Sequence, residues 1–378
     1  MRSTKEAYSH LFHDDETELF YVYNLDKLQD LFSIWECMFE RIHPYYAVKC
    51  NPDKMVIQTL AKCGANFDCA SPGEIMKVLD AGVCASRILY ANPCKRESDI
   101  RFMAKMGVGV TTADSVCELE KLAKHFPDVS VILRIYANDP SAKCVLSNKF
   151  GAYPEEWDGL LEKAKALNLR VIGVSFHVGS GACNPEVFQD AIRQARTVIE
   201  MGARHGHTMS VVDIGGGFSV SNANEMAASV RNSLEKHMHD LDVQIIAEPG
   251  RYFAETIATL YTRIVGVRER RGMRDYFITD SLYGSFNCVL YDHTQPYPNC
   301  VDLRKCVDAF SKQNSTIYGP TCDGLDKIVE VALPRLECGD WLRWDNMGAY
   351  TIAGACDFNG IVMTAPKCVY LPCQATKI

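Results

Sequence analysis

The sequence lacks several features that would place it in a special class of protein. It has no apolar run of the roughly 20 residues that a membrane-spanning helix needs, and its opening stretch, MRSTKEAYSHLFHDDETE, has no apolar core of signal-peptide length. We therefore expect a cytoplasmic protein that does not enter a membrane. The formal net charge is −7 and no basic patch is mixed with aromatic residues, which argues against a nucleic-acid-binding surface.

Other absences concern metals and repeats. The 17 cysteines are scattered and none forms a C-x-x-C pair, so we predict no metal site and expect most cysteines to be reduced, buried and structural. No internal repeat or low-complexity linker is present. What remains is ordinary: 47% hydrophobic and 23% charged residues are typical of a globular protein, and 378 residues suffice for two domains.

Short β-branched runs alternate with amphipathic stretches from about residue 25 to about residue 250. The stretches KMVIQTLAKCG, PGEIMKVLDAG and CELEKLAKHF carry apolar residues three and four positions apart, which predicts helices with one buried face. Eight strands alternating with such helices predict an α/β fold, a (β/α)8 barrel. The candidate strands are residues 45–50, 65–71, 87–93, 107–113, 129–136, 171–178, 209–217 and 243–250.

The pattern changes after Arg251. TRIVGVRER, RDYFITD, STIYG, KIVEVAL and DWLRW are strand-like, with no long helix between most of them. The early run FYVYN has no place in the barrel count and is expected to join these strands. We place the barrel at residues 25–255 and a β-rich domain at residues 1–24 and 256–378.

Polar residues and glycines gather where the predicted strands end. Catalytic groups of a (β/α)8 barrel lie at the carboxyl ends of its strands, so these residues are candidates for a site. They are Lys49, Asp68, Arg134, His177, Gly215, Gly216, Gly217, Glu248 and Arg251.

Two kinds of chemistry are indicated at these ends. Desolvation of Lys49 after an apolar run would lower its pKa and so favour the neutral amine that a Schiff base requires. The alternative is a lysine whose ammonium group reaches water. The glycines 215 to 217 precede a helix and can present N–H groups to a phosphate, or can serve a tight turn. Arg251 can pair with the same phosphate.

Glu248 ends the apolar run VQIIAE, where a carboxylate needs a cationic partner. That partner is either a protonated pyridine nitrogen or Arg134 in a structural salt bridge. His177, in SFHVGSG, either lies flat on a cofactor ring or is a core histidine bonded to the backbone. Ser180 adds a hydroxyl for a phosphate.

The β-rich domain has its own dense polar stretch, YGPTCDGLD. Cys322 and Asp323 lie there between a proline and a glycine, on a predicted loop where polar residues have functional weight, although Cys322 is also one of 17 cysteines. Asp292, in NCVLYDH, would ordinarily be a surface charge.

Together these motifs resemble the eukaryotic ornithine decarboxylase family, which belongs to the alanine-racemase-like class of pyridoxal-phosphate enzymes. The resemblance runs nearly end to end, through YAVKCN, NFDCAS, KFGA, SFHVGSG, DIGGGF, EPGRYF, YGSFNCVLYDH, GPTCDGLD, MGAYT and FNG. It implies a barrel with a β-domain, pyridoxal 5'-phosphate as cofactor, decarboxylation of L-ornithine to putrescine in polyamine biosynthesis, and a homodimer with shared active sites at its interface.

The resemblance also implies a role for each matching residue. For the cofactor ring and its pocket the implied residues are Lys49 as the covalent link, Glu248 at the pyridine nitrogen, His177 on the ring face, and Asp68, Glu74 and Arg134 as support. For the phosphate they are Ser180, Gly215, Gly216, Gly217, Gly250, Arg251 and Tyr350. For the substrate they are Tyr283, Asp292, Phe358 and, from the other subunit, Cys322 and Asp323.

The residues account for the implied reaction in physical terms. Glu248 keeps the pyridine nitrogen protonated, so the ring accepts the electron pair released with carbon dioxide. Cys322 or the freed Lys49 then protonates the α-carbon. Asp292 and Asp323 offer negative charge to the distal ammonium of ornithine and disfavour neutral side chains, which would leave buried carboxylates unpaired.

Alternatives remain on the same fold. They are decarboxylation of lysine, arginine or diaminopimelate, an amino-acid racemase, and a non-catalytic homologue of the antizyme-inhibitor type. GPTCDGLD and YDH favour the ornithine branch, and the complete set of cofactor residues favours an enzyme. The sequence ends at Ile378 without the long C-terminal tail of some animal members, and KCVYLPCQATKI has no counterpart in the resemblance, so antizyme binding is not carried over.

Overall fold

The computed structural model describes residues 7–14, 16–137, 149–181, 184–301 and 312–371. Contacts between Cα atoms divide the chain into two compact units. Residues 29–253 form one, called here the barrel unit, and residues 1–28 with 254–378 form the other, called here the sheet unit.

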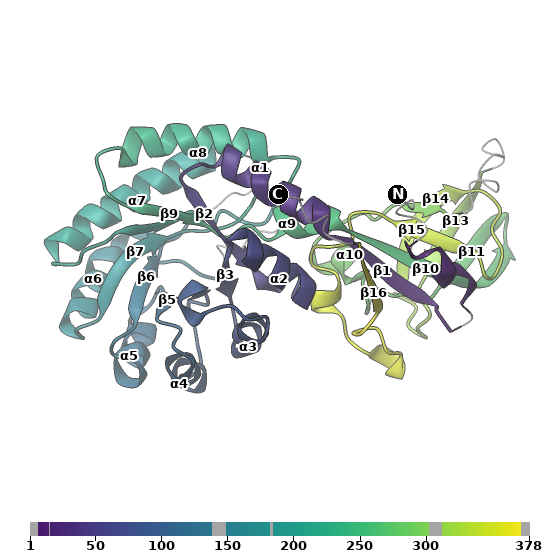
Figure 1. Ribbon diagram of the computed structural model, residues 1–378, viewed down its shortest axis with the longest axis horizontal. Coiled ribbons are helices and arrows are strands. Elements are labelled where there is room, and N and C mark those ends of the chain that lie inside the picture. Colours follow the sequence, from purple (N-terminus) through teal and green to yellow (C-terminus); the bar gives the residue numbers. More distant parts are fainter. Residues whose placement is uncertain (1–6, 15, 138–148, 182–183, 302–311, 372–378) are drawn as a thin grey trace, which may run out of the picture. The chain divides into compact units, whose positions relative to one another are not determined.

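Eight parallel strands close into a barrel, which confirms the predicted fold class (Figure 1). The strands pair in chain order, and β9 returns to pair with β2. They are β2 (Ile42–Ala47), β3 (Asn66–Cys69), β4 (Ile88–Tyr90), β5 (Val110–Ala113), β6 (Ser130–Arg134), β7 (Arg170–Ser175), β8 (Val211–Asp213) and β9 (Gln244–Ala247).

Each predicted barrel strand overlaps an observed one, but every predicted strand except the one at 107–113 runs too far at its carboxyl end. The run predicted at residues 45–50 includes Val48–Cys50, which form a 3-10 turn after β2. The run predicted at 243–250 likewise extends past β9. Lys49 and Glu248 therefore lie on the loops that follow the strands, where side chains can converge on a ligand.

Helices cover the outside of the barrel, as Figure 1 shows. Side chains of Asp53, Ser71 and Ser115 accept N–H groups in the first turns of three of them, and Gly64 and Gly107 end two in the left-handed conformation. The helices are α1 (Leu25–Met38), α2 (Lys54–Cys63), α3 (Pro72–Asp80), α4 (Glu97–Met106), α5 (Val116–His125), α6 (Trp157–Ala166), α7 (Glu186–Arg204), α8 (Ala223–Met238) and the short α9 (Arg251–Ala254).

The sheet unit is built from strands far apart in the sequence. The path β12-β15-β10-β11-β13-β14 is extended by β1, which pairs antiparallel with β10 and parallel with β16. FYVYN thus joins the later strands, as predicted. The elements are β1 (Leu19–Asn24), β10 (Ala258–Arg270), β11 (Met273–Ile278), α10 (Asn287–Tyr291), β12 (Pro298–Cys300), β13 (Gln313–Tyr318), β14 (Lys327–Leu333), β15 (Trp341–Trp344) and β16 (Lys367–Leu371).

Each unit has its own apolar core. Inside the barrel, Leu89, Ile132 and Ile246 form a buried cluster. In the sheet unit the rings of Phe20 and Tyr261 stack with centroids 4.9 Å apart on the paired strands β1 and β10. Such aromatic contacts bury large areas and fix the register of the two strands.

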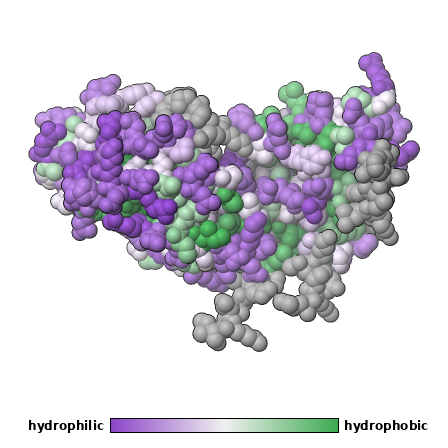
Figure 2. Space-filling view, turned by 90° about the horizontal axis from the view of Figure 1, so that it is seen from above, coloured by the Kyte–Doolittle hydropathy of each residue, from purple (hydrophilic) through white to green (hydrophobic). Residues whose placement is uncertain are grey.

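The expectation that most cysteines are buried is wrong for the described residues. The structure describes 13 cysteines, all free thiols, and only Cys50, Cys69 and Cys288 are buried. Position explains the difference, because several thiols, such as Cys37 and Cys117, lie on outward faces of surface helices. Figure 2 shows one face of the molecule, where hydrophilic residues predominate and hydrophobic ones form small groups. No helix in the described ranges is long and apolar enough to cross a membrane.

Candidate active site

Lys49 and Asp68 form an ion pair at the carboxyl ends of β2 and β3. Ala47 and Asp68 are partners in the parallel ladder, which brings the turn carrying Lys49 beside the end of β3. Asp68 is fully buried, and its Oδ1 atom has no hydrogen-bond partner in the described part of the chain. A buried carboxylate oxygen without a donor is costly, so this site suits a further cationic or N–H group.

Two more buried carboxyl groups lie at the ends of β8 and β9. Asp213 Oδ1 accepts the N–H of Gly215 at 2.9 Å, and the Gly215 carbonyl accepts the N–H of Glu248 at 2.7 Å. Burial raises the pKa of Asp213 to about 7. Burial, with the charges of Asp213 and Asp68, raises the pKa of Glu248 well above its usual range. This concentration of buried acid favours protons or a cation in the site.

Arg134, at the end of β6, does not neutralise this acid. No ion pair joins Arg134 to Glu248 among the residues that the structure describes, so the predicted alternative of a structural salt bridge is wrong. The Arg134 guanidinium lies over the Phe150 ring, 5.4 Å from its centroid. Its charge lowers the pKa of both Asp213 and Glu248, but burial outweighs it.

His177 follows β7 and is held as a neutral ring. Its Nδ1 atom accepts the N–H of Gly179 at 3.0 Å. Burial, with the charges of Arg134 and Lys49, lowers the pKa of His177 well below its usual range. A Cβ atom on Gly216 would lie 2.8 Å from the His177 Nε2 atom, so only glycine lets this backbone pass the ring.

Two of the residues predicted to bind phosphate, Ser180 and Arg251, are in contact after β7 and β9. Arg251 is buried at the start of α9, and its Nη2 atom donates to the Ser180 hydroxyl at 3.3 Å. Gly250 packs so closely on Cys50 that a Cβ atom would lie 2.8 Å from the Cys50 Cβ. Gly217 has a φ of 108°, a conformation that side chains disfavour. A buried guanidinium beside a hydroxyl suits an anion.

Glu74 has a second function that sequence analysis missed. Its carboxylate accepts the Ala70 N–H at 2.7 Å, while the Ser71 hydroxyl accepts the Glu74 N–H at 3.2 Å. The Ser71 hydroxyl caps the start of α3, and the Glu74 carboxylate orders the backbone directly after β3. The sequence signal was present as a serine followed three residues later by a glutamate.

Within the sheet unit, three loops bring most of the predicted substrate residues together. The Tyr283 hydroxyl donates to Asp323, and the Tyr283 ring stacks on Phe358 with centroids 4.0 Å apart. The Cys322 N–H donates to Asn359 Oδ1 at 3.0 Å, and Cys322 is exposed. An aromatic wall, a carboxylate and an exposed thiol are thus gathered on one loop cluster.

Buried acids that sequence analysis assigned no role hold these loops. Asp326 accepts the Ser281 hydroxyl and the Leu282 N–H, both at 2.9 Å, and the Thr321 hydroxyl at 2.6 Å. Asp280 accepts the N–H groups of Ser281 at 2.7 Å and Ser285 at 2.9 Å, and burial raises its pKa to about 6. Asp326 thus joins two loops, and Asp280 orders the turn that carries Tyr283.

Asp292 and Tyr350 lie elsewhere in the sheet unit. Asp292 is buried at the end of α10, where it accepts the Thr294 hydroxyl at 2.9 Å, so the expectation of an ordinary surface charge is wrong. Tyr350 has a φ of 54°, unusual for a residue other than glycine. Such a conformation persists only where neighbouring contacts hold it.

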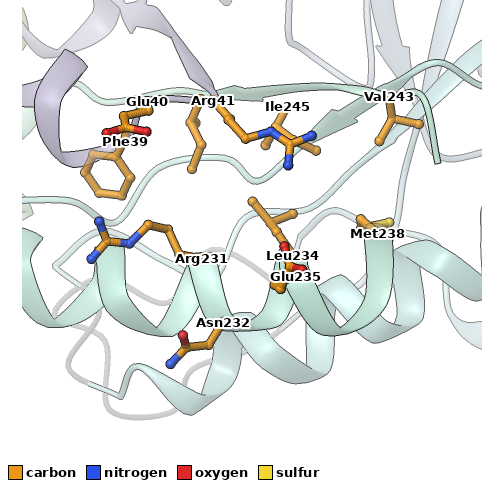
Figure 3. A pocket seen from close by; sticks show the side chains of 11 residues that line it. Phe39, Glu40, Arg41, Arg231, Asn232, Leu234, Glu235, Met238, Val243 and Ile245 are labelled. Carbon is orange, nitrogen blue, oxygen red and sulfur yellow. The ribbon is translucent and has the colours of Figure 1, made fainter. Parts of the chain in front are cut away.

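A separate cavity of about 260 Å³ lies at the amino end of the barrel strands (Figure 3). Figure 3 shows Phe39, Glu40 and Arg41 on one side and residues of α8, among them Arg231 and Leu234, on the other. It is lined mainly by apolar groups and is remote from the carboxyl ends of the strands. It contains none of the predicted site residues.

Comparison with known proteins agrees with this geometry. Residues 25–255 match the family described as "Pyridoxal-dependent decarboxylase, pyridoxal binding domain". The chain is 45% identical over 361 residues to the chloroplastic ornithine decarboxylase of Nicotiana glauca, covering 93% of this chain and 83% of that protein. It is 43% identical over 367 residues to the ornithine decarboxylase of Rattus norvegicus, covering 92% and 79%.

Solved structures with the same fold are also similar. The arginine decarboxylase of Paramecium bursaria Chlorella virus superposes with a TM-score of 0.91 and 39% identity, covering 95% of this chain and 97% of that one. The lysine/ornithine decarboxylase of Vibrio vulnificus in complex with putrescine gives a TM-score of 0.88 and 30% identity, covering 98% and 99%.

Proposed function

Because the chain belongs to the pyridoxal-dependent decarboxylase family, we propose that it converts L-ornithine to putrescine and carbon dioxide with pyridoxal 5'-phosphate as cofactor, a reaction of polyamine biosynthesis. The observation that carries the proposal is the buried acid around Lys49. Asp68, Asp213 and Glu248 are buried together near Lys49, and burial raises the pKa of Asp213 and Glu248, so a further cation would stabilise their ionised forms. A cofactor with a protonated ring nitrogen meets that need.

The bound cofactor supplies an electron sink for the pair of electrons left when carbon dioxide departs. Glu248 would hold the proton at the ring nitrogen, and its burial would strengthen that contact. Lys49 would be the amine that links to the cofactor, and Asp68 holds its Nζ atom in place. His177, whose pKa is lowered by burial, would face the ring without adding a positive charge.

We propose that the cofactor phosphate is bound in the barrel unit by Ser180, Arg251 and the glycines 215 to 217, with Gly250 and Tyr350 contributing. The contact between Arg251 and Ser180 supports this assignment. Glu74 and Arg134 support the pocket through α3 and β6.

The substrate residues of the proposal are Tyr283, Asp292, Cys322, Asp323 and Phe358. The Asp323 carboxylate, already bonded to Tyr283, binds the distal ammonium, and Asp292, which is buried, adds a second carboxylate. A substrate without that ammonium would leave carboxylates unpaired. Cys322 returns a proton to the α-carbon, with Lys49 as the competing donor.

A homodimer with shared sites belongs to the same proposal. Leu325 is 78% exposed on the loop that carries Cys322 and Asp323, and Tyr291 is 74% exposed beside Asp292. Large exposed apolar side chains beside functional residues suit a subunit interface. Diluting the protein until it is monomeric should abolish activity, and unchanged activity per chain in demonstrated monomers would contradict the shared site. A cytoplasmic location remains a prediction from the sequence.

The central test is release of carbon dioxide from ornithine, lysine, arginine and diaminopimelate, each with and without added pyridoxal phosphate. Ornithine should be preferred, and cofactor should be required. A preference for lysine or arginine would overturn the assignment of ornithine as the substrate and leave the proposed mechanism intact.

Cofactor binding itself separates an enzyme from a non-catalytic homologue. The purified protein should be yellow, and borohydride should fix the cofactor to Lys49 but not to the Lys49→Ala variant. If the wild-type protein takes up no pyridoxal phosphate when the cofactor is supplied, the proposal that it is an enzyme is refuted.

A further inference from the structure

Asn287 connects two segments of the sheet unit that carry different parts of the proposed site. It is the first residue of α10 and is 3% exposed. Its Nδ2 atom donates to the carbonyl of Gly284, in the turn that carries Tyr283, and to the carbonyl of Thr351, the residue after Tyr350. Both acceptors are carbonyls, so the amide nitrogen must face them, and both of its hydrogens are used.

The segment around Tyr350 needs such support. Tyr350 has a φ of 54°, and the next residue, Thr351, is buried and donates its hydroxyl to the Met347 carbonyl at 2.8 Å. The Asn287 amide adds a bond from outside the segment. A strained residue keeps one conformation only where bonds of this kind over-determine it.

The Asn287 amide also donates a hydrogen bond to the turn that carries Tyr283. Its backbone is linked to the segment a second time, because the Cys356 N–H donates to the Tyr283 carbonyl at 2.8 Å. Gly354 leaves room for Asn287, since a Cβ atom there would lie 2.6 Å from the Asn287 Oδ1 atom. The asparagine is therefore the buried side chain through which the two segments are held in one arrangement.

We propose that Asn287 is a positioning residue that couples ornithine binding at Tyr283 to cofactor phosphate binding at Tyr350. The inference rests on the proposed function, because the roles of the two tyrosines come from it. Asn287 touches neither ligand and acts through the backbone on both sides.

The test measures two constants in the Asn287→Ala enzyme: the dissociation constant of pyridoxal phosphate, by titration of the cofactor-free protein followed by absorbance, and the KM for ornithine at saturating cofactor. Removing both donors from buried carbonyls should raise each constant about tenfold. The turnover number per loaded site should change less. Asn314→Ala, at an exposed position of β13 in the same unit, is the matched control and should change neither constant.

A merely structural role would lower the melting temperature and leave both constants unchanged, and that result would overturn the inference. A change in only one constant would also overturn it, since the coupling would be absent. If Asn287→Ala does not fold, Gly354→Ala provides the test, because its methyl group displaces Asn287 while keeping the amide. It should raise both constants together.

A double-mutant cycle with Tyr350→Phe adds a second readout. If Asn287 acts through Tyr350, the two changes should be non-additive in cofactor affinity, whereas independent effects add. A wild-type protein that neither binds the cofactor nor decarboxylates ornithine would refute the proposed function itself. If the wild-type protein binds the cofactor and decarboxylates ornithine, but the effects of the two substitutions on cofactor affinity are additive, only the role of Asn287 is refuted.

Discussion

Asp213→Asn should stabilise the cofactor-free protein, and more so at higher pH. Folding raises the pKa of the Asp213 carboxyl from 3.8 to about 7, chiefly through burial. The folded state therefore binds its proton more tightly than the unfolded state, so ionisation opposes folding as the pH rises between these values. Above pH 7 the cost is about 4 kcal/mol, and near pH 4.5 it is about 1 kcal/mol.

Asparagine removes the charge and keeps an oxygen that accepts the Gly215 N–H. The free energy of unfolding should therefore rise by up to about 4 kcal/mol at pH 8 and by about 1 kcal/mol at pH 4.5. Denaturant titration of cofactor-free protein at several pH values measures this difference. An equal gain at every pH, or a loss at pH 8, would refute the reasoning. Saturating pyridoxal phosphate should reduce the pH dependence, because a cationic ring favours the ionised acids.

Three further predictions concern activity. Gly216→Ala should weaken cofactor binding more than tenfold, because the methyl group would meet the His177 ring, whereas Gly159→Ala, at an open position on α6, should not. Glu248→Gln should lower kcat/KM for ornithine by a factor that corresponds to about 2–5 kcal/mol, because the substitution removes one partner of a buried charge pair. A loss of less than tenfold would contradict the role of Glu248. Cys322→Ala should lower kcat with little change in KM if the thiol returns the proton, and an unchanged kcat would assign that step to Lys49.

Counting strands was enough to predict the barrel, and examining their ends gave the candidate residues of its site. Lys49, His177 and Glu248 follow apolar runs, and closure of eight parallel strands brings such positions to one face. The exact residues at which the strands end were harder to predict from the sequence. Val48–Cys50 leave the sheet for a turn, although their residue types also suit a strand.

Residues whose importance comes from tertiary contacts could not be predicted. Asp326 and Asp280 are ordinary acidic residues in the sequence. Only the folded structure shows that Asp326 accepts a hydrogen bond from Ser281, 45 residues away, and that Asp280 accepts the N–H groups of the turn that follows it. Asn287 requires knowledge of both carbonyls that it meets. For Asp292 the surface alternative rested on where most aspartates lie, but its side chain is buried although Leu290 and Tyr291 beside it are exposed.

The position of β1 has a consequence for how the chain acquires its structure during synthesis. This early strand pairs on one side with β10 and on the other with β16, the last strand described. All eight barrel strands lie between β1 and β10 in the sequence. The barrel can therefore close before β10 and β16 are available to pair with β1. The sheet unit is completed only when β16 has emerged from the ribosome. A nascent chain stopped after β9 would carry an unpaired hydrophobic strand, FYVYN, whose free edges are open to mispairing.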